Sequence, residues 1–194
     1  MGKTLGEKIL SNKSGLDAKA GGVVIVPVDI VYAHDVSGPL CSMQKGKEIR
    51  FGDNISTDLI IPGRYNYLRS NLPELARHAF EDADATFTAR VKPGDVVVAG
   101  RNFGLGSIRE HAAIVIKMNG VSAVVAKSVA RIFFRNAINI GLPVIIADTE
   151  NISDGDELEV DLSSGTLSDL TTGGKLTFSK LPSVMLQILE EGGG

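Results

Sequence analysis

Three short apolar runs alternate with two helix-like segments between residues 95 and 148, and this alternation constrains the fold more than any other feature. The apolar runs are residues 95–99, 121–127 and 142–148. Segments 109–119 and 128–140 lie between them, and each is followed by a glycine, which is typical of a helix C-terminus. Strands that alternate with helices usually pair in parallel through right-handed crossovers. The sequence therefore predicts a parallel βαβ core.

The pattern changes after Thr149, where short segments of alternating apolar and polar residues replace the helices. These segments are residues 156–162, 165–170 and 175–180, and Ser-Ser-Gly and Thr-Gly-Gly turns separate them. Short alternating strands joined by such turns predict an antiparallel meander. A last helix is expected from Pro182. The predicted fold class is therefore α/β, with a mixed sheet that has a parallel βαβ core and an antiparallel C-terminal end.

The first part of the chain is less regular. We expect an amphipathic helix at residues 4–12, a strand at 23–28, a polar linker at 41–50, an extended segment at 51–62, an exposed loop at 63–72 and a helix at 73–80. The last of these begins with Pro73, which suits the first position of a helix. We divide the chain into an N-terminal segment, residues 1–44, and a domain, residues 45–194.

The composition is that of an ordinary globular protein, because 43% of the 194 residues are hydrophobic and 22% are charged. The formal net charge of −3 gives no field that would attract nucleic acid or an anionic membrane. No apolar run reaches the roughly 20 residues of a membrane-spanning helix, and the opening residues lack the pattern of a signal peptide. The single cysteine, Cys41, indicates a reducing compartment, so we expect a cytoplasmic protein. One thiol also cannot hold a four-iron cluster, which several thiolates ligate.

The segment GRNFGLGSIREHA, residues 100–112, is the best candidate for a functional site. It follows a predicted strand and leads into a predicted helix, which is where open α/β sheets bind ligands. Gly100, Gly104 and Gly106 permit tight turns and close approach of a ligand to the backbone. Ser107 is expected at the helix N-cap, where free N–H groups and the helix dipole favour a carboxylate or a serine alkoxide.

A purely structural interpretation of this segment is also open. Ser107 and Glu110 match the capping-box pattern S-x-x-E, which serves only to begin a helix. Arg109 favours a function, because a cation in the first helical turn opposes the dipole by roughly 0.3–1 kcal/mol unless an anion pairs with it. His111 follows in the same turn, although a lone histidine is more often a structural residue.

Two neighbouring segments add further polar residues. The extended segment carries Asp53, Thr57 and Asp58 before its apolar end. Such residues either form local turns with the backbone or line a site, and their spacing alone does not decide between these roles. The loop that follows carries Arg64 and Arg69, which are either solvated surface charges or a clamp for the carboxylate of a substrate.

Three motifs stand out when the segments are taken together: DNISTDLIIP at 53–62, YLRS at 67–70 and GRNFGLGSIREHA at 100–112. Together they resemble the small subunits of the isopropylmalate isomerases and their homoaconitase and aconitase relatives. They occur in the family's order and spacing, and the likeness covers about residues 45–190. The resemblance implies an aconitase-type swivelling β/β/α domain that closes over an iron–sulfur large subunit. It implies a 4Fe-4S cluster held by three cysteines of that partner, and no metal ligand in this chain.

The resemblance also implies roles for individual residues. Ser107 matches the serine that, as an alkoxide, removes the proton from carbon during dehydration. Arg109 matches an arginine that binds a substrate carboxylate, and Asp58 matches an acidic residue that lines the site. Arg69 lies in the loop that reads the variable group of the substrate. We expect further substrate contacts from Arg64, Thr57, Gly106 and Ile108.

The chain departs from the family's pattern in two places. The family commonly has Cys-Gly-Ser-Ser-Arg where this chain has Leu-Gly-Ser-Ile-Arg, at residues 105–109. Ile108 replaces a serine that relatives use near the substrate, which implies one hydrogen bond fewer and a less polar ligand. Residues 3–40 resemble the start of the large subunit rather than of the small one. His34 and Asp35 lie there, and a structural role is favoured for them because neighbours on an extended chain point to opposite faces.

The resemblance implies a hydro-lyase subunit that interconverts 2-isopropylmalate and 3-isopropylmalate in leucine biosynthesis, in a hetero-oligomer with the large subunit. Arg69 keeps a homoaconitase open, because a cation there suits a further carboxylate, and a dimethylmalate or methylcitrate dehydratase is open as well. In each case the substrate is a small hydroxy di- or tricarboxylic acid. A non-catalytic structural or regulatory subunit competes, since Leu105 and Ile108 alter the motif. RNA binding, known in some relatives, is disfavoured because the chain has no basic stripe.

Overall fold

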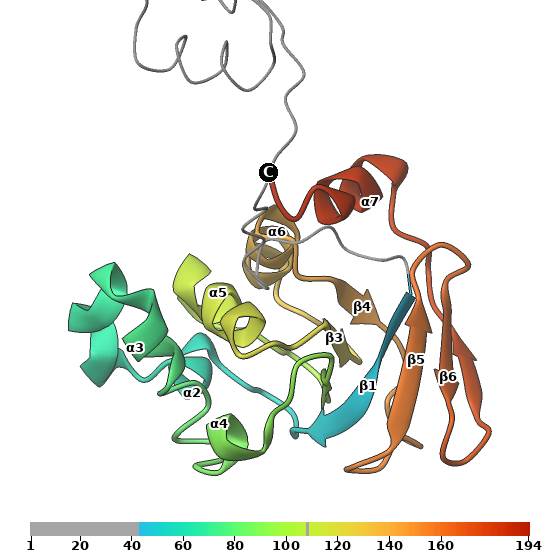
Figure 1. Cartoon of the computed structure of the whole chain (residues 1–194), viewed down its shortest axis with the longest axis horizontal. Helices are drawn as coiled ribbons and strands as arrows, with labels where there is room; N and C mark the ends of the chain where they lie inside the picture. The colour runs from blue at the N-terminus through green and yellow to red at the C-terminus, as the bar shows by residue number, and fades with distance from the viewer. Residues whose placement is uncertain (1–42, 108) are drawn as a thin grey trace, which may run out of the picture. The chain divides into compact units, whose positions relative to one another are not determined.

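The computed structural model describes residues 43–107 and 109–194 (Figure 1). The helix predicted at 4–12, the strand predicted at 23–28, Cys41, His34, Asp35 and Ile108 lie outside the described residues. Those expectations therefore stay predictions, as does the division of the chain into residues 1–44 and 45–194. Within the described part, no helix is both long enough and apolar enough to cross a membrane.

A mixed sheet of seven strands forms the centre of the described part, in the order β4-β3-β2-β1-β5-β6-β7 (Figure 1). The strands are β1 Met43–Arg50, β2 Val96–Ala99, β3 Ala123–Ala126, β4 Val144–Ile146, β5 Glu157–Asp161, β6 Thr166–Asp169 and β7 Lys175–Thr177. Strands β1 to β4 pair in parallel, whereas β5, β6 and β7 continue the sheet in antiparallel on the other side of β1. The predicted parallel core and antiparallel C-terminal end are confirmed.

The central strand β1 corrects the prediction of a polar linker at residues 41–50. Its last three residues pair with β2, and its earlier residues pair with β5. The first residues of β1 are exposed or half-buried, so they need not be apolar. Gly46 lies against the backbone of Gly94, because a Cβ at Gly46 would stand 2.0 Å from the Gly94 carbonyl oxygen. A strand with this close approach carries too few apolar side chains to be recognised from its pattern.

Helices connect the parallel strands β1 to β4, and helices cover both faces of the sheet (Figure 1). They are α2 Thr57–Ile60, the 3-10 helix η1 Gly63–Ser70, α3 Leu72–Ala76, α4 Phe87–Arg90, α5 Glu110–Met118, α6 Arg131–Asn139 and α7 Ser183–Glu190. Helices α5, α6 and α7 confirm the three predicted at 109–119, at 128–140 and after Pro182, apart from their ends.

The secondary structure between β1 and β2 differs more from the sequence prediction than that of the helices α5, α6 and α7. Segment 51–62 is not extended throughout, because Ser56 caps α2 by accepting a hydrogen bond from the Leu59 N–H at 3.1 Å. None of residues 63–70 is buried, and five of the eight are exposed, but they form the regular helix η1 rather than the predicted exposed loop. The helix predicted at 73–80 is α3, which ends at Ala76, and α4 was missed because it has only four residues.

Two apolar cores lie on the two faces of the sheet. Neighbouring residues of a strand point to opposite faces, and in β2 Val97 belongs to one core whereas Val98 belongs to the other. The first core includes residues of α2, α3, α4 and α5, and the second includes residues of α7 and the antiparallel strands. Helix α6 contributes Phe133 to the first core and Ile138 to the second. The first core therefore fixes the helices that surround the carboxyl ends of β1 and β2.

Glu48 is a carboxylic acid buried inside the sheet, with 2% of its surface exposed. Its Oε2 accepts a hydrogen bond from the Gly155 N–H at 3.1 Å, whereas Oε1 has no partner among the described residues. Burial raises the pKa of Glu48 to about 8, although the Gly155 N–H opposes this shift. Near neutral pH, the folded chain therefore keeps a proton here that the unfolded chain releases.

We expect the free energy of unfolding to fall as the pH rises from about 5 to about 8, because the folded state binds the Glu48 proton and the unfolded state does not. The Glu48→Gln variant should lose this slope, and at about pH 8 it should exceed the unmodified chain in stability by a few kcal/mol. Urea unfolding at several pH values measures both effects. Glu159→Gln, on the neighbouring strand β5, is the control, and equal slopes for Glu48→Gln and the unmodified chain would contradict the prediction.

Candidate active site

The segments that follow β1 and β2 run side by side and form the base of the site. Their backbone hydrogen bonds run from Gly100 N to Gly52 O, from Asn54 N to Arg101 O, from Gly104 N to Ile55 O and from Thr57 N to Leu105 O, with lengths of 2.7–3.1 Å. β1 and β2 are parallel neighbours, so their continuations leave the sheet at the same edge. The predicted glycine-rich motif is thereby joined to the predicted extended segment.

Side chains lock the same two segments together. Asp53 Oδ1 accepts a hydrogen bond from the Arg101 N–H at 2.6 Å, and the Asn102 side-chain amide donates to Asn54 Oδ1 at 2.8 Å. Both asparagines have left-handed backbones, with φ of 60° and 59°, which asparagine tolerates better than most residues. Asp53 therefore neither forms a purely local turn nor lines a pocket, but holds the glycine-rich segment in place ahead of α5.

Ser107 lies two residues before the N-cap of α5, so the expected serine N-cap and capping box are wrong. The N-cap is Arg109, whose side chain makes no capping hydrogen bond, and the helix begins at Glu110. Gly106, with φ of 108°, turns the chain away from helical geometry, and the Ser107 N–H donates to Thr57 Oγ1 at 3.1 Å. The exposed Ser107 hydroxyl has no hydrogen-bond partner among the described residues. The structural interpretation of this serine therefore loses its support.

Thr57 lies beneath Ser107 and holds the backbone on both sides of Gly106. It is 1% exposed, its hydroxyl accepts the Ser107 N–H, and its own N–H donates to the Leu105 carbonyl at 2.8 Å. A buried hydroxyl used in this way positions the loop above it. Direct contact of Thr57 or Gly106 with a substrate stays a prediction.

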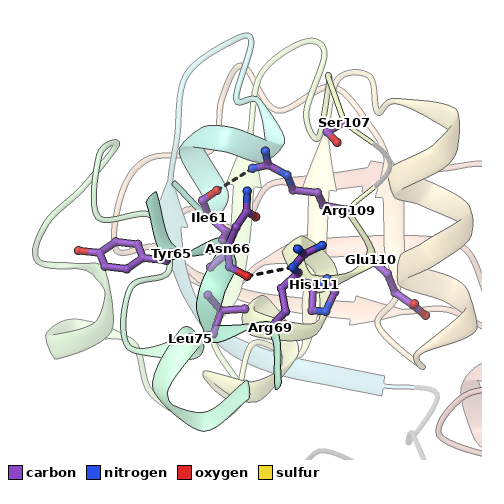
Figure 2. Close-up of a pocket in the computed structure, with 9 residues that line it drawn as sticks. All are labelled: Ile61, Tyr65, Asn66, Arg69, Leu75, Ser107, Arg109, Glu110 and His111. Atoms are coloured by element: carbon purple, nitrogen blue, oxygen red, sulfur yellow. Dashed lines mark hydrogen bonds between the residues drawn. The ribbon is translucent and has the colours of Figure 1, made fainter. Parts of the chain in front are cut away.

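Arg109 is paired with a carboxylate of its own chain. Its Nη1 lies 2.5 Å from Asp58 Oδ1. The same nitrogen also donates to the Ile61 carbonyl at 3.3 Å (Figure 2). This ion pair joins the start of α5 to α2. The position of Arg109 near the helix N-terminus had indicated a nearby anion, and Asp58 is that anion. Nη2 of Arg109 has no hydrogen-bond partner among the described residues, so the guanidinium group retains a free donor for a second carboxylate.

A pocket of about 340 Å³ opens beside Arg109 (Figure 2). It is lined by Ile61, Tyr65, Asn66, Arg69, Leu75, Ser107, Arg109, Glu110 and His111. Arg69 reaches it from η1, where its Nε donates to the Asn66 carbonyl at 2.9 Å. A volume of this size suits a small ligand, and two guanidinium groups in the wall suit the carboxylates of an organic acid.

Comparison with known proteins gives the family of this fold and site. Residues 48–149 match the aconitase C-terminal domain. The chain belongs to this family. It is 60% identical to 3-isopropylmalate dehydratase small subunit 2 of Archaeoglobus fulgidus over 148 residues, which cover 76% of this chain and 90% of the relative.

Two other relatives agree with this assignment. The methanogen homoaconitase small subunit of Methanothermobacter thermautotrophicus is 53% identical over 150 residues, which cover 77% of this chain and 86% of that protein. A crystal structure of 3-isopropylmalate dehydratase from Methanocaldococcus jannaschii superposes with a TM-score of 0.74 at 47% identity, and covers 78% of this chain and 90% of that one. The predicted family and its swivelling-domain fold are confirmed.

Not every predicted residue of this aconitase C-terminal domain faces the pocket. Arg64 belongs to η1 but its guanidinium group binds Glu81 and Asp82 at 2.7–3.1 Å, and it is absent from the pocket wall. Ile108 lies outside the described residues. A direct contact of either residue with substrate therefore stays a prediction, whereas Ser107, Arg109 and Arg69 do share one pocket.

The pocket also contains residues that sequence reasoning missed. Asn66 had a signal, because it lies in a segment rich in Asn, Tyr and Arg next to Arg69. Ile61 and Leu75 had none, since each looks like an ordinary core residue of the aconitase C-terminal domain. His111, for which a structural role was favoured, lines the wall.

Proposed function

We propose that this chain is the small subunit of a 3-isopropylmalate dehydratase, a hydro-lyase that acts together with an iron–sulfur large subunit. The observation that carries the proposal is the convergence of Ser107, Arg109 and Arg69 on one pocket. A hydroxyl group without a partner and two guanidinium groups are the parts needed to bind a hydroxy dicarboxylic acid and remove one of its protons. The names of the relatives point to the same reaction.

In the proposed mechanism, Arg109 and Arg69 bind carboxylates and Ser107 acts as the base. The Ser107 alkoxide takes the proton from the carbon next to the one that carries the hydroxyl group, the electron pair of that C–H bond forms a C=C double bond, and the hydroxyl group leaves as hydroxide. Hydroxide then adds to the carbon that lost the proton, and Ser107 returns its proton to the carbon that lost the hydroxyl group, which regenerates the alkoxide and moves the hydroxyl to the adjacent carbon. The unpaired N–H groups at the start of α5 and the charge of Arg109 stabilise the alkoxide. Asp58 holds Arg109 in place at 2.5 Å.

The iron–sulfur cluster of such a reaction belongs to the partner in this proposal. A 4Fe-4S cluster needs several cysteine thiolates, and this chain has one cysteine, Cys41. In the described ranges, no group of three or more His, Cys, Asp or Glu side chains is placed to hold a metal ion. When bound, the cluster supplies a Lewis acid for the hydroxyl and carboxylate of the substrate. A single cysteine also supports a reducing, cytoplasmic location.

Isopropylmalate is the first choice of substrate, and leucine biosynthesis is the corresponding pathway. The replacement of a serine by Ile108 supports it, because it removes a polar group from the motif beside the base. A homoaconitase subunit is the second candidate, because Arg69 lines the pocket and suits a further carboxylate. The 53% identical homoaconitase relative favours the same second candidate.

Co-expression with a cognate large subunit under anaerobic conditions tests the proposal. The complex should hydrate isopropylmaleate with a kcat/KM at least about tenfold above that for cis-homoaconitate. Loss of the ultraviolet absorbance of the double bond measures both rates. The reverse preference would establish the homoaconitase function. A stable, cluster-loaded complex that hydrates neither acid would leave a non-catalytic subunit as the better description.

The Arg69→Met variant should separate the two substrates. It keeps an unbranched apolar side chain but removes the guanidinium group, so the KM for isopropylmaleate should rise by about tenfold, and the KM for cis-homoaconitate should rise by more, because a cation there also suits its additional carboxylate. Arg77→Met is the control, because Arg77 is exposed and pairs only with Glu74 among the described residues. Equal increases for both acids would show that Arg69 binds a carboxylate that both share.

A further inference from the structure

Helix η1 carries three residues of the pocket wall, Tyr65, Asn66 and Arg69, on a backbone that needs outside support. Runs of 3-10 helix longer than three or four residues are uncommon, because their hydrogen bonds have poor geometry. η1 has eight residues and none of them is buried, although Tyr65 and Leu68 are half-buried against the first core. The direction in which Arg69 points therefore depends on the contacts that η1 makes with its neighbours.

One carboxylate, that of Glu81 in the turn after α3, accepts hydrogen bonds from two side chains of η1. Its Oε1 accepts hydrogen bonds from Arg64 Nη2 at 3.1 Å and from the Tyr65 hydroxyl at 3.0 Å. Its Oε2 lies 3.0 Å from the same hydroxyl and 2.7 Å from His78 Nδ1. The hydrogen bond to His78, and then those to Arg64 and Tyr65, lower the pKa of Glu81, so the carboxylate stays ionised at neutral pH.

Ring contacts hold the same part of η1. The Tyr65 ring stacks on the His78 ring with centroids 3.7 Å apart, and the Arg64 guanidinium carbon lies 4.8 Å from the Tyr65 centroid. Arg64 also binds Asp82 through two hydrogen bonds of 2.7 and 2.8 Å. Figure 2 shows Tyr65 at one side of the pocket, with Asn66 and Arg69 between it and the start of α5. The first turn of η1, which includes the pocket residue Tyr65, is therefore held by these contacts, and Asn66 and Arg69 follow it along the same helix.

We propose that Glu81 is a positioning residue for this active site, which sets the orientation of η1 and through it the direction of Arg69. The proposal rests on the proposed function, because it concerns how the segment that meets the substrate is held. Glu81 does not line the pocket. Its loss should therefore weaken substrate binding through Arg69 and leave the chemistry at Ser107 largely intact. In this arrangement Arg64 acts through Glu81 and Asp82.

The Glu81→Gln variant tests the role, since it keeps the shape of the side chain but replaces one acceptor oxygen by a donor. In the complex with the large subunit, the KM for isopropylmaleate should rise roughly tenfold, while kcat should change by less than about threefold. In the full chain alone, amide hydrogen exchange across residues 63–70 should become faster by about tenfold, while exchange in α5 stays unchanged. Glu150→Gln is the matched control, because it breaks an exposed ion pair with Lys127 of 2.9 Å elsewhere.

A second variant, Tyr65→Phe, keeps the ring stacked on His78 but removes the hydroxyl that Glu81 binds, and it should change KM and exchange in the same direction by a smaller factor. If Glu81→Gln fails to fold, the Tyr65→Phe variant alone tests the positioning role of Glu81. Unchanged exchange in η1 would overturn the positioning role whatever the activity, and so would an unchanged KM in an active complex. If the unmodified complex hydrates neither acid, the proposed function is wrong, and hydrogen exchange alone then decides whether Glu81 holds η1.

Discussion

Ser107→Ala should lower the kcat for hydration of isopropylmaleate by roughly 10²–10⁴-fold, which is the usual contribution of a positioned general base. The variant should still fold and bind the large subunit. The Ser107 hydroxyl is exposed and has no hydrogen-bond partner among the described residues, so its removal leaves no polar group unsatisfied. The contact that holds this residue is made by its backbone N–H, which donates to Thr57 and is unchanged in alanine.

Initial rates at saturating substrate measure the effect, and co-purification with the large subunit measures assembly. Ser168→Ala is the matched control, because Ser168 lies on β6 in the antiparallel end of the sheet and does not line the pocket. It should retain full activity. If Ser107→Ala also retains full activity, the assignment of the base is wrong. If it fails to assemble, Ser107 has a structural role that its exposed hydroxyl does not indicate.

Gly104→Ala should lower the free energy of unfolding by about 2–4 kcal/mol, through two costs that add. Gly104 has φ of 72°, a left-handed conformation that costs an alanine about 1 kcal/mol. A Cβ would also stand 2.3 Å from Cγ of Phe133, which is 2% exposed and packs edge-on against Phe103 at 5.2 Å. The ring cannot move aside without disturbing the first core, because Phe133 and Phe103 both belong to that core and their rings are in contact.

Gly173→Ala separates these two costs. Gly173 has φ of 78°, close to that of Gly104, but a Cβ there would meet no atom within 4 Å. It should therefore lose only about 1 kcal/mol, the cost of the backbone conformation alone. Urea unfolding of both variants measures the difference. Equal losses would mean that Phe133 gives way at no cost, and that close packing does not explain the glycine at position 104.

The parts of this fold that local pattern could reveal were predicted well. Strands β2 and β3 are buried on both faces, and β4 is buried except for Ile146, so all three appear as continuous apolar runs. Each helix between them is followed by a glycine with positive φ, Gly120 or Gly141. Strand β1 was missed because the residues that make it a buried strand are tolerated only next to partners far along the chain. Its Gly46 needs the backbone of Gly94, and its buried Glu48 depends on the loop around Gly155.

Some features of the candidate site could likewise be predicted from the sequence, whereas others depend on the tertiary structure. Local spacing and counting were enough to establish which residue types are present, that a glycine-rich segment joins a strand to a helix, and that one cysteine is too few for an iron–sulfur cluster. Three-dimensional packing was needed to show that Ser107 stands outside the helix, that Arg109 pairs with Asp58, and that Arg64 turns to Glu81. Each of these three arrangements depends on a hydrogen-bond partner that lies many residues away in the sequence. The packing of η1, α2 and α5 brings that partner within hydrogen-bonding distance.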